Sequence, residues 1–159
     1  MASLHERVIE LLPGLRRYAC ALTGNRGIGD EYIRVALLVQ MEDPRHLKAD
    51  VDLKFQLYKL FHKVLDALIV PADESVAEVA GAASFPGVEE WLIALPLLSR
   101  KILLLTTVEG FAVERAAALL GLPVREARLR LVRARMQMSC VGAPSLAPRL
   151  SRFLGRRAA

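Results

Sequence analysis

The sequence predicts an all-α protein made of two small helical lobes. Apolar residues recur every three to four positions along the chain, which is the period of an α-helix, and no strand-length alternation stands out. A stretch rich in alanine and acidic residues between two prolines, PADESVAEVAGAASFP, interrupts this pattern. We therefore expect helical lobes at 1–70 and 87–140, joined by a linker at 71–86 and followed by a basic tail at 141–159.

The first lobe is expected to begin with two helices. Ser3 is a suitable N-cap for the first helix, because Glu6 follows three residues later as in a capping box. Pro13 is expected to interrupt or kink this helix before it resumes. Asp30 is expected to cap the second helix, EYIRVALLVQM, which ends before Pro44.

A third helix is expected within RHLKADVDLKFQLYKLFHKVLDALIV. Its core-facing stripe is formed by apolar residues that share one face: Leu57, Phe61, Val64 and Leu68, flanked by Tyr58 and Leu65. Phe55 and His62 fall on the opposite side of this helix, so we expect both side chains to point away from the core.

The second lobe contains a helix-turn-helix pattern in FAVERAAALLGLPVREARLRLVRA. The small side chains of Ala116 and Ala117 allow two helices to cross closely. Gly121 tolerates the positive φ that a tight turn needs, and Pro123 is well placed at the start of the following helix. Trp91, upstream of this pattern, is expected to lie in the core of the lobe.

The last helix of this pattern carries two apolar stripes. At about 100° per residue, one face consists of five residues spaced three and four apart, which we assign to the core: Val124, Ala127, Leu131, Ala134 and Met138. A second stripe, formed by Leu129, Val132 and Met136, lies roughly opposite. Three arginines border the second stripe: Arg125, Arg128 and Arg133.

The second stripe occupies the side on which a recognition helix would read DNA. Base edges and phosphates are recognised by hydrogen-bonding and cationic side chains, and leucine, valine and methionine provide neither. The pattern is better suited to an amphipathic helix of a partner protein, with apolar anchors in the middle and arginines pairing with acidic residues at the rim. An open alternative is that helically spaced apolar residues of the tail cover this stripe: Leu146, Leu150, Phe153 and Leu154.

The composition favours an anionic partner and a reducing environment. The formal net charge of +5 is typical of proteins that bind nucleic acids or acidic proteins. A mean hydropathy of +0.31 is high for a chain of which 25% is charged, so we expect apolar surface to remain for a partner. Cys20 and Cys140 lack the spacing of a zinc site or a disulfide framework.

Enzymatic and membrane functions are not indicated. The opening residues, MASLHERVIELLPG, mix charged with apolar residues, and no apolar run approaches the ~20 residues of a membrane span. The histidines lack the spacing of a metal-binding helix: His5, His46 and His62. We therefore expect a cytoplasmic, non-catalytic protein without a metal or cofactor.

The helix-turn-helix stretch resembles region 4 of extracytoplasmic-function sigma factors, and the N-terminal half has the size and helix order of their region 2. LPGLRRYACALTGNRGIGDEYIRVAL and LYKLFHKV are more similar to the sigma-factor-like domain of PhyR, the alphaproteobacterial general stress response regulator. The resemblance covers about residues 4–138. It implies an anti-anti-sigma factor that mimics a sigma factor and captures a NepR-like anti-sigma factor. The alternative is an extracytoplasmic-function sigma factor or transcription regulator that binds DNA.

Departures from a working sigma factor favour the mimic. Sigma region 2 typically docks on RNA polymerase through a helix with a DLVQ-like run, whereas here Asp30 is followed by EYI, and apolar residues surround most of the helix. The expected partner-binding residues of the second lobe are Arg125, Arg128, Leu129, Val132, Arg133 and Met136. Those expected in the first lobe are Val35, Leu38, Phe55 and His62.

The resemblance also implies a receiver domain, which PhyR carries after its sigma-like part. Here the sequence ends in LSRFLGRRAA, with no strand followed by a phosphoacceptor aspartate. We therefore expect this chain to bind its partner without phosphorylation. The sequence leaves open whether the chain is a stand-alone mimic or an isolated domain, and whether a receiver on a separate chain is a further partner.

Overall fold

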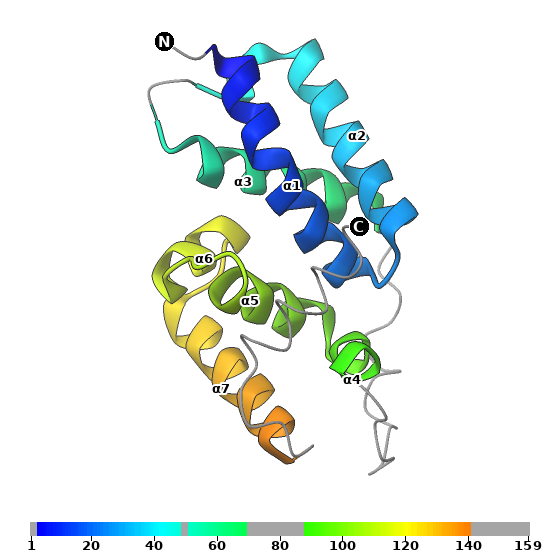
Figure 1. The fold of residues 1–159 in the computed structure, drawn as a ribbon. Helices are drawn as coiled ribbons and strands as arrows, with labels where there is room; N and C mark the ends of the chain where they lie inside the picture. The colour runs from blue at the N-terminus through cyan, green and yellow to red at the C-terminus, as the bar shows by residue number, and fades with distance from the viewer. Residues whose placement is uncertain (1–2, 49–50, 70–87, 141–159) are drawn as a thin grey trace. The chain divides into compact units, whose positions relative to one another are not determined.

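The computed structural model describes residues 3–48, 51–69 and 88–140, and these residues form seven α-helices and one 3-10 turn, without a strand (Figure 1). The all-α prediction is therefore confirmed. The chain divides into two compact units, Met1–Val70 and Pro71–Ala159. The predicted linker at 71–86 and tail at 141–159 lie outside the described residues, so their bounds stay predictions.

The first unit begins with α1 (Leu4–Thr23). The predicted capping box is present, because the Glu6 amide donates to Ser3 Oγ at 3.2 Å and the Ser3 amide donates to Glu6 Oε2 at 2.6 Å. Pro13 lies inside one continuous helix, so the interruption that we considered does not occur. Gly24 ends α1 in the left-handed conformation, with φ of 71°.

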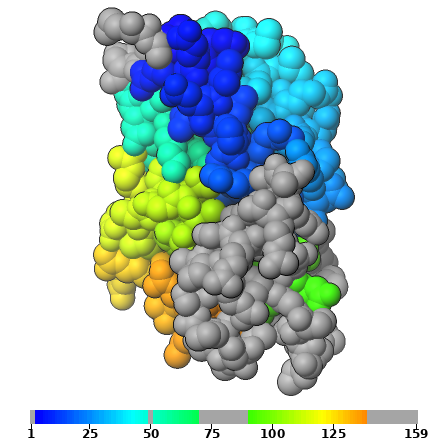
Figure 2. Space-filling view, viewed as in Figure 1, coloured from blue at the N-terminus to red at the C-terminus, as the bar shows by residue number. Residues whose placement is uncertain are grey.

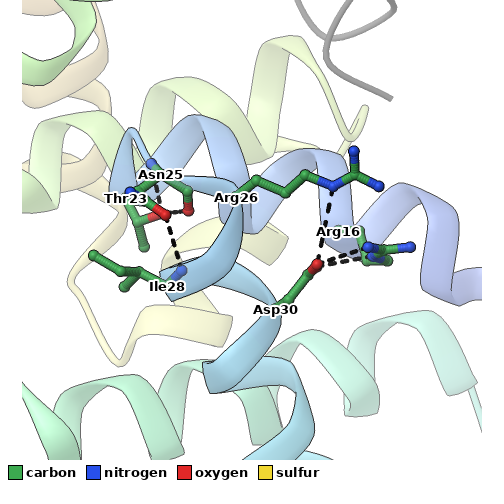
Figure 3. A network of polar contacts seen from close by, with 6 residues as sticks. All are labelled: Arg16, Thr23, Asn25, Arg26, Ile28 and Asp30. Atoms are coloured by element: carbon green, nitrogen blue, oxygen red, sulfur yellow. Dashed lines mark hydrogen bonds and ion pairs between the residues drawn. The ribbon is translucent and has the colours of Figure 1, made fainter. Parts of the chain in front are cut away.

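The second helix, α2 (Arg26–Glu42), begins earlier than the sequence suggested. Its N-cap is Asn25, whose side chain accepts a hydrogen bond from the Ile28 amide at 3.1 Å. The prediction that Asp30 caps this helix is therefore wrong. Asp30 lies within the helix and forms an ion pair with Arg16 of α1, with Nη2 to Oδ2 at 2.6 Å. Figure 3 shows Arg16 and Arg26 converging on this carboxylate.

Gly29 allows α1 and α2 to approach closely. A Cβ atom at this position would lie 2.9 Å from the carbonyl carbon of Ala19 and 3.0 Å from the amide nitrogen of Cys20. These distances are shorter than van der Waals contact, so only glycine fits between the two backbones without displacing one of them. In Figure 2 the side chains of α1 and α2 form one continuous surface on the side shown.

The third helix, α3 (Leu53–Leu68), follows the 3-10 turn η1 (Pro44–His46) and packs against both α1 and α2. Five of the six predicted core residues are buried: Leu57, Tyr58, Phe61, Val64 and Leu65. The assignment of Leu68 to the core is wrong, because Leu68 is the last helical residue and 49% of it is exposed.

The outward placement of His62 is also wrong. His62 is only 2% exposed, and its Nε2 lies 2.8 Å from the Tyr18 hydroxyl. His62 lies one turn after Tyr58, and the Tyr18 ring of α1 contacts Tyr58, Phe61 and His62 alike, so the buried face of α3 is wider than the predicted stripe. Phe55, on the first turn of α3, is half-buried.

The second unit contains α4 (Val88–Ala94), α5 (Leu97–Thr107), α6 (Val113–Leu120) and α7 (Val124–Cys140). Helix α5 contacts the other three helices and provides a run of fully buried residues: Ile102, Leu103, Leu104 and Leu105. Trp91 of α4 is buried as predicted. Arg100 of α5 donates from Nη2 to the backbone carbonyls of Ile93 and Leu95, which holds the end of α4 against α5.

The predicted helix-turn-helix comprises α6, the turn and α7 (Figure 1). Ala116 and Ala117 are fully buried, which permits the close crossing of the helices. Gly121 adopts the left-handed conformation with φ of 67°, and α7 begins directly after Pro123. The Pro123 carbonyl accepts the first hydrogen bond of α7, from the Ala127 amide at 3.1 Å.

Candidate partner-binding surface

Helix α7 presents an apolar stripe on the side away from its core. The core side is as predicted, with Val124 half-buried and the remaining four residues buried: Ala127, Leu131, Ala134 and Met138. The opposite side exposes 58% of Leu129, 51% of Val132 and 64% of Met136. We call these three residues the α7 stripe. The predicted orientation of the stripe is therefore confirmed, whereas its binding role is not tested by its exposure.

The α7 stripe has the spacing of an anchor set for another helix. Its members lie three and four residues apart, so they fall within about 60° of one another around the helix axis. At about 1.5 Å of rise per residue, the distance from Leu129 to Met136 covers about two helical turns, roughly 10 Å. The alternative in which the tail covers this stripe concerns residues 141–159, which lie outside the described residues.

The arginines beside the stripe differ in their electrostatic partners. Arg125 and Arg133 are exposed and form no ion pair with any residue in 3–48, 51–69 or 88–140. Arg128, by contrast, forms an ion pair with Glu114 of α6, with Nη2 to Oε1 at 2.6 Å. This hydrogen bond lowers the pKa of the Glu114 carboxyl below its usual value. Among the described residues, Arg125 and Arg133 therefore have no ion-pair partner, whereas Arg128 is paired with an acidic side chain of the same unit.

Sequence reasoning missed the Glu114–Arg128 pair. The two residues are 14 positions apart, and the turn between α6 and α7 brings them together. Charge patterns along one helix reveal pairs at three or four positions, such as Glu126 and Arg130 on α7, which also form an ion pair at 2.8 Å. Finding the Glu114 pair from sequence requires the crossing geometry of the helix-turn-helix.

The first unit offers a less continuous candidate surface. Leu38 of α2 is exposed, and Val35, one turn earlier, is half-buried. Two residues of α2 that the sequence reasoning did not select are more exposed than Leu38: Ile28 at 50% and Met41 at 76%. Because His62 is buried, the surface of the first unit consists of residues of α2, with Phe55 of α3 as a half-buried addition.

The described residues contain neither a metal-binding cluster nor a helix suited to a membrane. Among residues 3–48, 51–69 and 88–140, no group of three histidine, cysteine or acidic side chains is placed to hold a metal ion. No helix within the same residues has the length and apolar character that crossing a membrane requires.

The fold and its helix-turn-helix define a protein of the sigma-factor type. Two families match the chain, the Sigma2 domain of PhyR at residues 8–62 and Sigma-70, region 4 at residues 88–138. The solved PhyRSL-NepR complex from Sphingomonas sp. Fr1 matches with a TM-score of 0.67 and 30% identity, covering 93% of this chain and 95% of that chain. The chain therefore belongs to the family of PhyR sigma-like domains.

Two curated relatives are similar to different degrees. The phyllosphere-induced regulator PhyR of Methylorubrum extorquens is 31% identical over 126 residues, which cover 79% of this chain. The RNA polymerase sigma factor EcfG of Rhodopseudomonas palustris, of the extracytoplasmic-function type, is 26% identical over 153 residues, covering 87% of this chain and 84% of that protein. The present chain spans 45% of the length of the PhyR relative.

Proposed function

We propose that this chain is an anti-anti-sigma factor, a sigma-factor mimic that sequesters a NepR-like anti-sigma factor. Sequestration lowers the concentration of free anti-sigma factor and so releases the stress sigma factor by mass action. The observation that carries the proposal is the exposure of the α7 stripe on the helix that would otherwise read DNA. The family membership and the relative solved in complex with NepR support it. We expect a non-catalytic, cytoplasmic protein.

The energetics of the α7 stripe favour a protein partner. Full burial of a leucine, valine or methionine side chain stabilises a complex by about 1.5 to 3 kcal/mol. The same side chains pressed against base edges would leave polar groups without hydrogen bonds, at about 1 to 3 kcal/mol each. An amphipathic helix with apolar residues at matching spacing gains the free energy of apolar burial and leaves no polar base edges without hydrogen bonds.

A DNA-binding sigma factor is the second candidate function. The similarity to EcfG over 84% of its length favours it, as do Arg125 and Arg133, which form no ion pair within the part of the chain that the structure describes. Binding dominated by phosphates weakens steeply with salt, because cations that neutralise phosphates release counterions. Binding through the α7 stripe should retain most of its affinity at the same salt concentrations.

The test is the variant Leu129→Asp together with Val132→Asp, measured for binding to NepR from Sphingomonas sp. Fr1. We expect wild-type protein to form a stoichiometric complex and the variant to bind at least about a hundredfold more weakly, because two central anchors are replaced by charges. Circular dichroism should show unchanged helicity, since both positions are exposed.

Three matched controls separate the causes of a loss. Leu131→Asp lies on the same helix but enters the core, where Leu131 is 7% exposed, and should unfold the second unit. Gln137→Asp adds a charge at an exposed polar position of α7 and should bind normally. Leu129→Asn with Val132→Asn removes the apolar contacts without adding charge and should still lose binding. The proposal is overturned if the wild-type protein binds promoter DNA with a steep salt dependence and does not bind NepR.

A further inference from the structure

The ion pair between Glu114 and Arg128 lies beside the α7 stripe. Arg128 directly precedes Leu129 in sequence, and its guanidinium contacts the Glu114 carboxylate at 2.6 Å. The side chains of Arg128 and Glu114 are 63% and 52% exposed, so the pair is open to solvent and to competing charges. A partner that covers Leu129 therefore comes close to a cation that is already neutralised.

The N-terminus of α6 and Arg128 of α7 both keep Glu114 negatively charged. Glu114 lies in the first turn of α6, where the partial positive charge of the helix N-terminus favours a carboxylate. The hydrogen bond from Arg128 lowers the pKa of Glu114, with a smaller contribution from a backbone hydrogen bond. Glu114 is therefore ionised throughout the neutral pH range and competes with any acidic group that approaches Arg128.

We infer that Glu114 is a specificity-determining residue, which occupies Arg128 as an internal substitute for an acidic side chain of the partner. The inference rests on the proposed function, because it concerns the surface that the partner covers. An acidic side chain of the partner that reaches Arg128 either displaces Glu114 or lies beside its negative charge, so the new charge pair brings little net gain. Arg125 and Arg133 carry no such competitor among the described residues.

This exchange makes binding depend on the apolar anchors. A ligand that offers negative charge alone, such as a disordered acidic segment or nucleic acid, meets a surface whose net positive charge Glu114 lowers by one. A ligand that also buries the α7 stripe still binds, because burial of apolar surface does not depend on displacing Glu114. The pair therefore selects partners that combine an apolar helix face with acidic residues.

The experiment is a double-mutant cycle with Glu114→Gln and Arg128→Gln, binding NepR from Sphingomonas sp. Fr1 at about 0.05 M and about 0.5 M salt. We expect Glu114→Gln to bind about two to five times more tightly at low salt, since Arg128 becomes available to the partner. The gain should shrink at high salt, where exposed charges are screened. In the Arg128→Gln background the same substitution should give no gain.

A charge-matched control is Glu90→Gln on α4, where an exposed carboxylate forms no ion pair with any residue in 3–48, 51–69 or 88–140. A gain for Glu114→Gln no larger than that for Glu90→Gln overturns the inference. An equal gain with and without Arg128 also overturns it, because Glu114 would then act by simple repulsion. In both cases a loss of binding in the Leu129→Asp, Val132→Asp variant leaves the proposed function standing. If the wild-type protein does not bind NepR, both the inference about Glu114 and the proposed function are contradicted.

Discussion

The hydroxyl of Tyr18 lies 2.8 Å from Nε2 of His62, and both side chains are almost completely buried in the first unit. Tyr18 belongs to α1 and His62 to α3, so the contact joins two helices that are 44 residues apart in sequence. The two rings also meet edge to face, with centroids 5.6 Å apart. The core of this unit therefore depends on a specific polar contact as well as on apolar packing.

We predict that Tyr18→Phe destabilises the first unit by about 1 to 3 kcal/mol, because a buried nitrogen of His62 loses a hydrogen bond while the ring packing is kept. The two units have separate spectroscopic reporters. All three tyrosines lie in the first unit, and the only tryptophan, Trp91, is buried in the second. The urea unfolding transition followed by tyrosine fluorescence should move to lower urea, whereas the transition followed by Trp91 fluorescence should not.

The control for this change is Tyr32→Phe, which removes a hydroxyl from a half-buried position of α2. It should change stability by less than about 0.5 kcal/mol, as substitutions away from buried contacts usually do. Equal effects of the two substitutions would mean that the hydrogen bond between Tyr18 and His62 contributes nothing to the core.

A second prediction concerns the crossing of α1 and α2. Gly29→Ala should cost about 1 to 3 kcal/mol, because its Cβ would lie 2.9 Å from the Ala19 backbone and force the helices apart. Gly27→Ala is the matched control on the same helix, since Gly27 is exposed and a Cβ there meets only the Asn25 side chain, at 3.3 Å. Chemical denaturation measures both. If the Gly29→Ala and Gly27→Ala proteins are equally stable, α1 and α2 leave room for a Cβ atom at position 29 and the prediction is contradicted.

A third prediction concerns the pH dependence of the Arg16–Asp30 pair. The hydrogen bond from Arg16 lowers the pKa of Asp30 below 3.8, its value in an unfolded chain. A carboxyl with a lowered pKa in the folded state stabilises the fold above its unfolded pKa, and this stabilisation is lost as the pH falls through the folded value. Asp30→Asn should therefore cost about 0.2 to 1 kcal/mol at neutral pH, a modest amount because the pair is partly exposed.

The difference in stability between wild type and Asp30→Asn should close as the pH falls below 3.8. Arg16→Gln should cost less than Asp30→Asn and close only part of the difference, because Arg26 Nε, 4.0 Å from Asp30 Oδ2, still faces the carboxylate. A constant difference down to acidic pH would show that Asp30 stabilises α2 by some means other than its charge.

The sequence predicted the helices and the outer face of α7 because periodicity reports which side of a helix is apolar. Leu129 and Leu131 are two residues apart and chemically identical, yet the sequence correctly placed the first outside and the second inside. For His62 the same reasoning failed. Periodicity does not give the width of a buried face, and here Tyr18 of α1 extends that face from Tyr58 and Phe61 to His62.

Local competition between caps explains another failure. Asn25 and Asp30 are both good N-caps, and the sequence reasoning chose the later one because it stood directly before the apolar run. The chain turns at Gly24, so Asn25 is the first residue able to cap α2, and Asp30 becomes available to Arg16. The Glu114–Arg128 pair escaped prediction for a related reason, since charges on different helices meet only once the turn between them is built.

The last prediction uses charge to separate the two candidate functions. Arg125→Glu together with Arg133→Glu reverses two exposed cations beside the α7 stripe and leaves its apolar residues intact. If the stripe binds a NepR-like protein, binding at low salt should weaken by about ten- to a hundredfold, mainly through slower association, and the difference from wild type should narrow at about 0.5 M salt. Surface plasmon resonance at two salt concentrations measures both effects.

If α7 instead reads promoter DNA, the same variant should lose DNA binding altogether and gain nothing from added salt, because salt weakens phosphate contacts in every variant. Recovery of NepR binding at high salt therefore points to apolar anchors as the main source of affinity, and a failure to recover contradicts that assignment.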